Sequence, residues 1–94
     1  MGNYKLSVEA EADLIRIHQW GVRNHGEEQA YRYFAAFFDH FEQLVERPLL
    51  YAVSDIRDGY RRSMCGKDSV YYRVEGQVVE IMAISGQQDT DDWL

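Results

Sequence analysis

The second half of the chain alternates between two sets of side chains, and this pattern limits the possible folds more than any other feature. Three segments show it, namely residues 60–64, 70–75 and 78–84. Alternation with period two, in segments rich in aromatic and β-branched residues, is typical of strands. Gly76 lies in the short connection between the last two segments and suits a tight hairpin turn. The sequence therefore predicts a three-stranded meander, onto which the first half must fit.

The composition describes a small acidic domain. The chain has 94 residues, 46% of them hydrophobic, and a net charge of −6. We expect one domain over residues 1–94, without general affinity for nucleic acid, although charge can still be segregated into a local basic patch. Cys65 is the only cysteine, so no intramolecular disulfide can form. With neither a signal-peptide pattern nor about 18 continuous apolar residues, the sequence predicts a cytoplasmic protein without a membrane segment.

The first part of the chain predicts a short strand followed by a helix. Residues 3–8 alternate, and either Ser7 or Glu9 is placed to begin a helix whose acidic first turn suits its positive end. One apolar stripe follows helical spacing and consists of Ala10, Leu14, Ile17 and Gly21. Gly26 is expected to stop this helix with a positive φ angle.

The second helix has the clearest periodicity in the chain. Its apolar side chains step by four, three, four and three, at Ala30, Phe34, Phe37, Phe41 and Leu44. Pro48 is expected to end it, because proline restricts the preceding residue and has no N–H to donate. The connection between the helices is short, so they should form an antiparallel hairpin that covers one face of the sheet.

These elements together predict an α+β fold with two layers. A helical hairpin packs on a mostly antiparallel four-stranded sheet, in the order strand, helix, helix, strand, strand, strand. A less regular loop over residues 49–59 leads into the second strand. The polar and acidic segment from Gln87 onward is expected to form a short tail or a single helical turn pinned by Trp93.

Short motifs in a consistent order along the chain resemble those of a known family. They are Tyr4–Ser7 with Ala10–Leu14 and Ile17, Gly26 with Gln29-Ala30 and Tyr33, Leu44 with Glu46–Pro48, Ile56–Arg62, Tyr71–Val74, Val79–Ile81 with Ile84, and Gln88-Asp89 with Trp93-Leu94. Together they resemble the ParE toxins of the RelE/ParE superfamily, the toxin half of bacterial toxin–antitoxin modules. The resemblance covers essentially the whole chain.

The resemblance implies both an activity and a partner. ParE-like toxins bind DNA gyrase, stabilise its cleaved complex and block replication. A ParD-like antitoxin is implied as well, in which a dimeric ribbon–helix–helix DNA-binding domain carries a tail that folds onto the toxin. We therefore expect a toxin–antitoxin hetero-oligomer, and a chain that works by binding rather than by catalysis.

Candidate contacts for these partners lie on the predicted loop before the second strand, on the strands and in the tail. They are Arg57, Tyr60, Arg61, Arg62, Arg73, Gln87 and Trp93. Arginine forms bidentate pairs with carboxylates, so one or more of the strand arginines is expected to hold an acidic antitoxin tail. The alternative is that each arginine is solvated or paired with Asp55, Asp58 or Asp68. Exposed aromatic residues can also receive an antitoxin helix in a groove, with Tyr31, Tyr51 and Trp20 as examples.

Two alternatives to gyrase inhibition stay open. The RelE branch cleaves mRNA on the ribosome, which needs groups that activate the 2′-hydroxyl and protonate the leaving oxygen. Arg57, the strand arginines and Lys67 can bind phosphate, but no Lys, Arg, His or Tyr follows Arg73. The other alternative is a decayed toxin, since Asp68 and Gln87 stand where many relatives carry a histidine and a basic residue.

The remaining reactive side chains predict no further site. His18, His25 and His40 lie on predicted helices, but nothing supplies a full set of metal ligands. Cys65 lies in a predicted turn without a base beside it. We expect no metal, no cofactor, no catalytic residue and no sequence-specific nucleic-acid binding by the chain alone.

Overall fold

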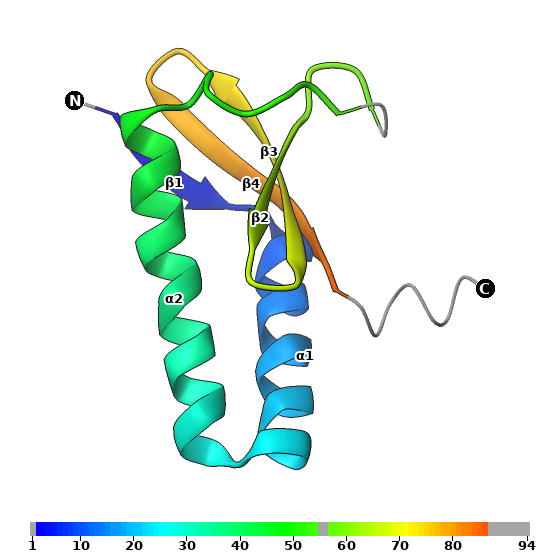
Figure 1. The fold of residues 1–94 in the computed structure, drawn as a ribbon. Helices are drawn as coiled ribbons and strands as arrows, with labels where there is room; N and C mark the ends of the chain where they lie inside the picture. Colours follow the sequence, from blue (N-terminus) through cyan, green and yellow to red (C-terminus); the bar gives the residue numbers. More distant parts are fainter. Residues whose placement is uncertain (1, 55–56, 87–94) are drawn as a thin grey trace.

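The computed structural model describes residues 2–54 and 57–86, which form a helical layer and a sheet (Figure 1). The elements are β1 (Asn3–Leu6), α1 (Val8–His25), α2 (Glu27–Glu46), β2 (Arg61–Cys65), β3 (Asp68–Glu75) and β4 (Val78–Ser85). This order confirms the α+β fold expected from the sequence. The predicted tail or helical turn, with Gln87 and Trp93, lies outside the described residues.

The four strands form one sheet in the order β1-β4-β3-β2. The pairs β2–β3 and β3–β4 are antiparallel, whereas β1 pairs in parallel with β4, so the sheet is mostly antiparallel as expected. Gly66 and Gly76 make the two hairpin turns, with φ angles of 61° and 60°. Glycine adopts such angles without the steric cost that a Cβ atom adds.

Both helix boundaries in the first part of the chain follow from single residues. Ser7 is the N-cap of α1, and its Oγ accepts a hydrogen bond from the Ala10 N–H at 3.0 Å. The expected strand over residues 3–8 therefore ends at Leu6, because Ser7 already serves the helix. Gly26, with φ of 88°, is both the C-cap of α1 and the N-cap of α2. A single residue thus reverses the chain and forms the predicted helical hairpin.

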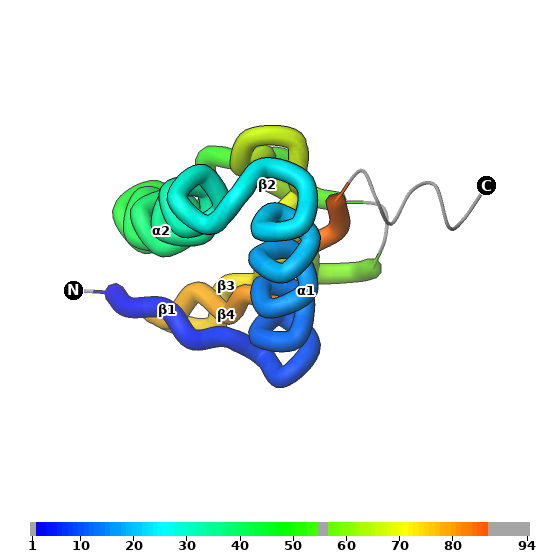
Figure 2. Tube along the Cα trace, turned by 90° about the horizontal axis from the view of Figure 1, so that it is seen from below, coloured from blue at the N-terminus to red at the C-terminus, as the bar shows by residue number. Residues whose placement is uncertain are grey.

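One hydrophobic core lies between the hairpin and the sheet. Figure 2, seen along the helices, shows β1, β4 and β3 side by side next to α2. The largest fully buried side chains come from α2 and from the strands, and include Phe37, Phe41, Leu44, Tyr72 and Ile81. The predicted stripe on α2 is thus confirmed, except that Phe34 is only partly buried.

A bulge in the β3–β4 pair changes which β4 side chains face the core. The register shifts between Tyr71, which pairs with Ala83, and Tyr72, which pairs with Ile81. Ile81 and Ile84 are both buried although they are three residues apart. Strict alternation would have placed them on opposite faces. Among the described residues, no helix is long and apolar enough to cross a membrane.

The buried side chain of His40 leads to a prediction about pH. His40 is only 9% exposed, and its Nε2 lies 2.7 Å from Ser63 Oγ. Burial lowers the pKa of His40 from its usual 6.5. As pH falls below that value, the unfolded chain takes up a proton that the folded chain does not, so stability decreases. The decrease ends once the pH is below the pKa of the folded state.

Urea unfolding between pH 7.5 and pH 5 measures this effect. His40→Gln should lower the stability at neutral pH and should flatten its decrease in this range relative to the unchanged chain. His25→Gln is the matched control, because it removes a histidine that is exposed at the end of α1. Equal profiles for the His40 variant and the unchanged chain would contradict the assignment to His40.

Candidate partner-binding site

One face of the sheet is turned away from the helices and carries most of the candidate contacts. Along β2, Ser63 and Cys65 are buried, whereas Arg62 and Met64 are exposed. The register places Arg62 opposite Tyr71 on β3. Tyr60 has the same parity as Arg62 and so belongs to this face as well. We call it the open face of the sheet.

Arg73, on the open face, is already bound by carboxylates of the same chain. Its guanidinium lies 2.7 Å from the Glu80 carboxylate and 3.3 Å from that of Glu75. The hydrogen bond to Glu80 raises the pKa of Arg73. Glu80 also lies 3.9 Å from the Lys5 ammonium group. A carboxylate from a partner would have to compete with these residues for Arg73.

Arg62 is in a different position, because no carboxylate neutralises it within residues 2–54 and 57–86. Its Nε donates a hydrogen bond to Ser69 Oγ at 3.0 Å, and its Nη2 lies 3.5 Å from Met64 Sδ. Beside this strand, the Arg57 guanidinium lies 5.7 Å from the centre of the Tyr60 ring. Arg57, Tyr60, Arg62 and Arg73 therefore come together at one side of the molecule.

Arg61 is separated from the other candidates by the alternation of β2. Its Nη1 donates a hydrogen bond to the Tyr51 carbonyl at 2.6 Å, which fastens the loop before β2 to the strand. The sequence predicted that Arg61 and Arg62 face opposite sides, and the structure confirms it. Of the acidic residues proposed to pair with these arginines, Asp58 forms no ion pair with them within residues 2–54 and 57–86. Asp68 accepts a hydrogen bond from Tyr33, and Asp55 lies outside the described residues.

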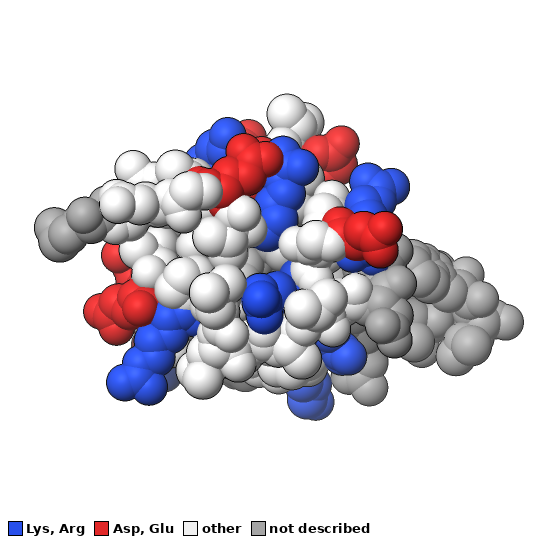
Figure 3. Space-filling model, turned by 90° about the horizontal axis from the view of Figure 1, so that it is seen from above, with Lys and Arg blue, Asp and Glu red and all other residues white. Residues whose placement is uncertain are grey.

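Basic side chains are concentrated in residues 47–73, which include β2 and most of β3. Residues 47–73 hold six of the ten Lys and Arg residues but three of the sixteen Asp and Glu residues. This segment therefore has a net charge of +3 in a chain of −6. Figure 3 shows basic side chains interleaved with acidic ones at the end of the molecule opposite the hairpin turn.

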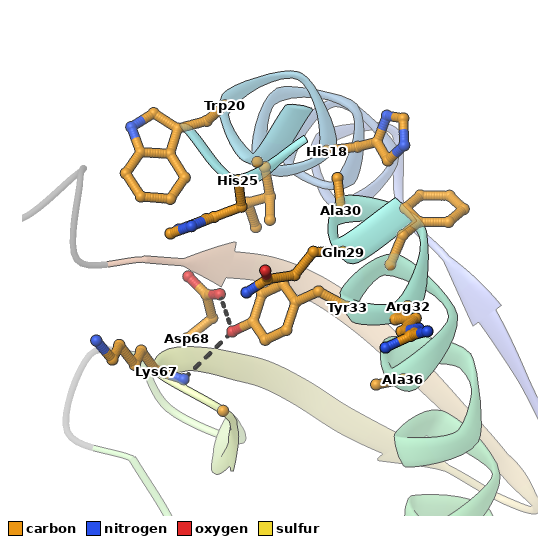
Figure 4. A pocket seen from close by; sticks show the side chains of 14 residues that line it. His18, Trp20, His25, Gln29, Ala30, Arg32, Tyr33, Ala36, Lys67 and Asp68 are labelled. Atoms are coloured by element: carbon orange, nitrogen blue, oxygen red, sulfur yellow. Dashed lines mark hydrogen bonds between the residues drawn. The ribbon is translucent and has the colours of Figure 1, made fainter. Parts of the chain in front are cut away.

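A groove of about 610 Å³ lies at the other end, between the two helices and the β2–β3 turn (Figure 4). Ile17, Ala30 and Phe34 are among its apolar lining residues. Trp20, one of the aromatic residues suggested for a groove, lines it and is 38% exposed. Tyr31 and Tyr51 are not among the lining residues.

Tyr33 closes the groove towards the sheet, and sequence reasoning missed this role. Figure 4 shows it reaching from α2 to Lys67 and Asp68. Its hydroxyl lies 2.5 Å from Asp68 Oδ2, to which it donates, and accepts from the Lys67 N–H at 3.2 Å. Burial and the hydrogen bond to Asp68 raise the pKa of Tyr33. Asp68 is thus a buried carboxylate that links the β2–β3 turn to α2. In the sequence, only the glycine at position 66 indicated that the turn passes close to another segment.

The expected position of Cys65 in a turn is wrong. Cys65 is the last residue of β2, because the hairpin turn consists of Gly66 and Lys67 alone. It is 8% exposed, and burial raises the pKa of its thiol to about 11. The thiol therefore stays protonated at neutral pH and is a poor nucleophile.

The histidines pack against other side chains. His18 lies edge-on to Phe34 at 5.2 Å between ring centres, and His25 lies edge-on to Trp20 at 5.6 Å. Within the described part of the chain, no three His, Cys, Asp or Glu residues are grouped so that they could hold a metal ion.

Comparison with known proteins yields one family. The profile of the family described as ParE toxin of type II toxin–antitoxin system, parDE, matches residues 4–90. Toxin ParE1 of Caulobacter vibrioides is 36% identical over 88 residues, which cover 93% of this chain and 91% of that protein.

Solved structures share the fold at lower sequence identity. A structure of the chromosomal ParDE system from P. aeruginosa matches with a TM-score of 0.80 and 24% identity, over 92% of this chain and 96% of the other. The RelBE2 toxin–antitoxin complex from Mycobacterium tuberculosis matches with a TM-score of 0.68 and 18% identity, over 92% and 98% of the two chains.

Proposed function

The chain belongs to the ParE toxin family of type II toxin–antitoxin systems, and on this basis we propose that it inhibits DNA gyrase and is neutralised by a ParD-like antitoxin. The observation that carries the proposal is the match to this family from the first strand to beyond β4. The toxin would act in the cytoplasm, by binding, and would be held inactive in a hetero-oligomer with its antitoxin.

The open face supports the antitoxin half of the proposal. Arg62 offers an acidic tail a guanidinium that is not paired with a carboxylate in the described residues. A bidentate contact to Arg62 would form without breaking an existing ion pair, whereas a contact to Arg73 would have to displace Glu80 or Glu75. Arg62 is therefore the first choice for the residue that holds the tail.

Binding without catalysis is supported by the state of the reactive side chains. The Cys65 thiol is buried, and the His40 imidazole is buried against Ser63. Neither is placed to take a proton from a substrate at the surface. The open face offers arginine guanidinium groups and tyrosine hydroxyls, which can donate hydrogen bonds to an anion.

A gyrase assay tests this function. Relaxed plasmid, ATP and gyrase are incubated with and without the purified protein, and both supercoiled and linear DNA are scored. We expect supercoiling to be lost and linear DNA to accumulate, because a ParE-type toxin stabilises the cleaved complex. Prior addition of the antitoxin from the neighbouring reading frame should prevent both effects.

Absence of any effect at a large molar excess of folded protein would rule out gyrase inhibition. A translating extract then distinguishes the remaining functions. Cleavage of mRNA in the extract would establish a RelE-type interferase, whereas intact mRNA would leave a toxin that has lost its activity.

A further inference from the structure

Arg62, Met64 and Ser69 form a small cluster of side chains on the open face. Met64 lies directly opposite Ser69 in the β2–β3 pair. The Met64 Sδ lies 3.4 Å from Ser69 Oγ and 3.5 Å from Arg62 Nη2. Arg62 Nε donates to the same Ser69 hydroxyl at 3.0 Å. Each of the three side chains therefore contacts the other two, and the sulfur atom faces two hydrogen-bond donors.

Met64 is more accessible to small molecules in water than the other sulfur-containing residues of the described chain. It is 49% exposed, whereas Met82 on β4 is half-buried. Cys65 is buried, and its raised thiol pKa keeps it in the less reactive protonated form. Since oxidation of sulfur in proteins depends on exposure, Met64 is the described residue that a small oxidant meets first.

Hydrogen peroxide converts the thioether of a methionine into a sulfoxide without a cofactor. A lone pair of the sulfur attacks one peroxide oxygen, so that the S–O bond forms while the O–O bond breaks. The proton on the attacked oxygen passes to the departing hydroxide, which leaves as water. The sulfur loses two electrons and the peroxide gains them. The product is a polar side chain, and methionine sulfoxide reductases convert it back to methionine.

We propose that Met64 is a site of reversible oxidation by hydrogen peroxide, and that its sulfoxide oxygen binds the Arg62 guanidinium in competition with an anionic partner. A thioether sulfur is only a weak acceptor, whereas the polar sulfoxide places an oxygen acceptor beside two donors that are already there. The hydrogen bond from the guanidinium is charge-assisted, which makes it about twice as strong as a neutral one. The effect on the antitoxin rests on the proposed function, in which Arg62 holds the acidic tail.

No carboxylate of the described chain has to be displaced when the sulfoxide binds Arg62. Arg62 forms no ion pair in this part of the chain, since the glutamates of the open face hold Arg73 instead. The buried carboxylate of Asp68 accepts a hydrogen bond from Tyr33, which comes from the helical layer. The sulfoxide oxygen therefore competes for Arg62 only with a partner molecule.

Oxidation at this position would make neutralisation by the antitoxin depend on peroxide. The apparent affinity of the antitoxin is reduced by the fraction of molecules in which Arg62 is available. If the sulfoxide holds Arg62 in about nine molecules of ten, that affinity falls about tenfold. An antitoxin tail bound to Arg62 would in turn cover the neighbouring Met64, so peroxide would act mainly on the free toxin.

Peroxide treatment of the purified full chain tests this inference. The chain is treated with hydrogen peroxide, the peroxide is destroyed with catalase, and mass spectrometry of tryptic peptides identifies the methionine that has gained one oxygen atom. We expect Met64 to react before Met82. In ¹H–¹⁵N NMR spectra the Arg62 Nε–H signal should then shift, whereas that of Arg73 should not. Isothermal titration calorimetry with untreated antitoxin should show an affinity lowered about tenfold, which methionine sulfoxide reductases restore.

Leucine variants of the two methionines provide the controls, and each is compared with itself before and after treatment. Met64→Leu cannot form the sulfoxide, so peroxide should not change its affinity for the antitoxin. Met82→Leu should lose affinity on treatment as the unchanged chain does. The inference is wrong if Met82 reacts first, if oxidised Met64 leaves the affinity unchanged, or if Met64→Leu loses as much affinity as the unchanged chain. If the untreated chain does not bind the antitoxin, the antitoxin half of the proposed function is wrong, and the effect inferred here is wrong with it.

Discussion

Replacing Arg62 with glutamate should weaken binding of the antitoxin by about 30- to 1,000-fold, the equivalent of 2–4 kcal/mol for a central interface residue. Arg62 is exposed on the open face and has no carboxylate partner among the described residues, so its charge is available to an acidic tail. A glutamate at this position removes the bidentate donor and repels the carboxylates that it is meant to bind.

Isothermal titration calorimetry with the purified antitoxin measures the change. Arg23→Glu is the matched control, because it changes the net charge equally from an exposed position on α1, on another part of the molecule. The control should weaken binding only slightly, through long-range repulsion that salt screens. If both variants lose the same affinity, the effect is due to net charge alone and the open face is not the antitoxin site.

Comparing alanine variants of Arg62 and Arg73 shows which of the two arginines binds the antitoxin more strongly. Arg73 is held by Glu80 and Glu75, so Arg73→Ala should cost less affinity than Arg62→Ala. A larger loss at Arg73 would mean that the antitoxin displaces the acidic residues on the open face. In that case Glu80→Gln should strengthen binding, because it frees the Arg73 guanidinium.

Replacing Gly66 with alanine should destabilise the protein by about 2–5 kcal/mol, a large effect for one added methyl group. The positive φ of 61° alone costs an alanine about 1–2 kcal/mol. In addition, a Cβ atom at this position would lie 2.6 Å from the Tyr33 hydroxyl oxygen. Relieving that overlap moves Tyr33 away from Asp68 and costs about 1–3 kcal/mol more.

Gly76→Ala provides the matched control for urea unfolding. Its φ of 60° is nearly the same and it also lies in a hairpin turn, but a Cβ atom there would meet no atom within 4 Å. The control should therefore lose only the conformational part of the stability. Equal losses for the two glycines would show that Tyr33 moves aside without cost, and that its contact with the β2–β3 turn contributes little.

The expected fold was confirmed because each element has a signal within a short stretch of sequence. The spacing of Phe37, Phe41 and Leu44 defines a helix and its buried side, since these residues lie on one face only with a helical period. Gly26 and Pro48 mark boundaries because their backbone preferences act locally. The predicted end of the first strand was wrong because Ser7 caps α1 instead of extending the strand.

The candidate site was only partly predictable for the same reason. Period-two alternation on β2 separates Arg61 from Arg62, but it cannot say which of them faces the helices. That choice depends on burial of Ser63 against His40, a contact between residues 23 positions apart. The carboxylates that hold Arg73 come from β3 and β4, so their effect appears only after the strands pair.

By itself, the sequence determined the kinds of element, their order, the buried stripe of α2 and the family to which the chain belongs. These properties depend on residue spacing and local backbone preference, which short segments already contain. Only the tertiary structure decided the bulge in β4, the burial of Cys65, the contact between Tyr33 and Asp68, and the groove beside Trp20. Each of these depends on packing between segments far apart in the chain, where the distance between two side chains is set by the whole core.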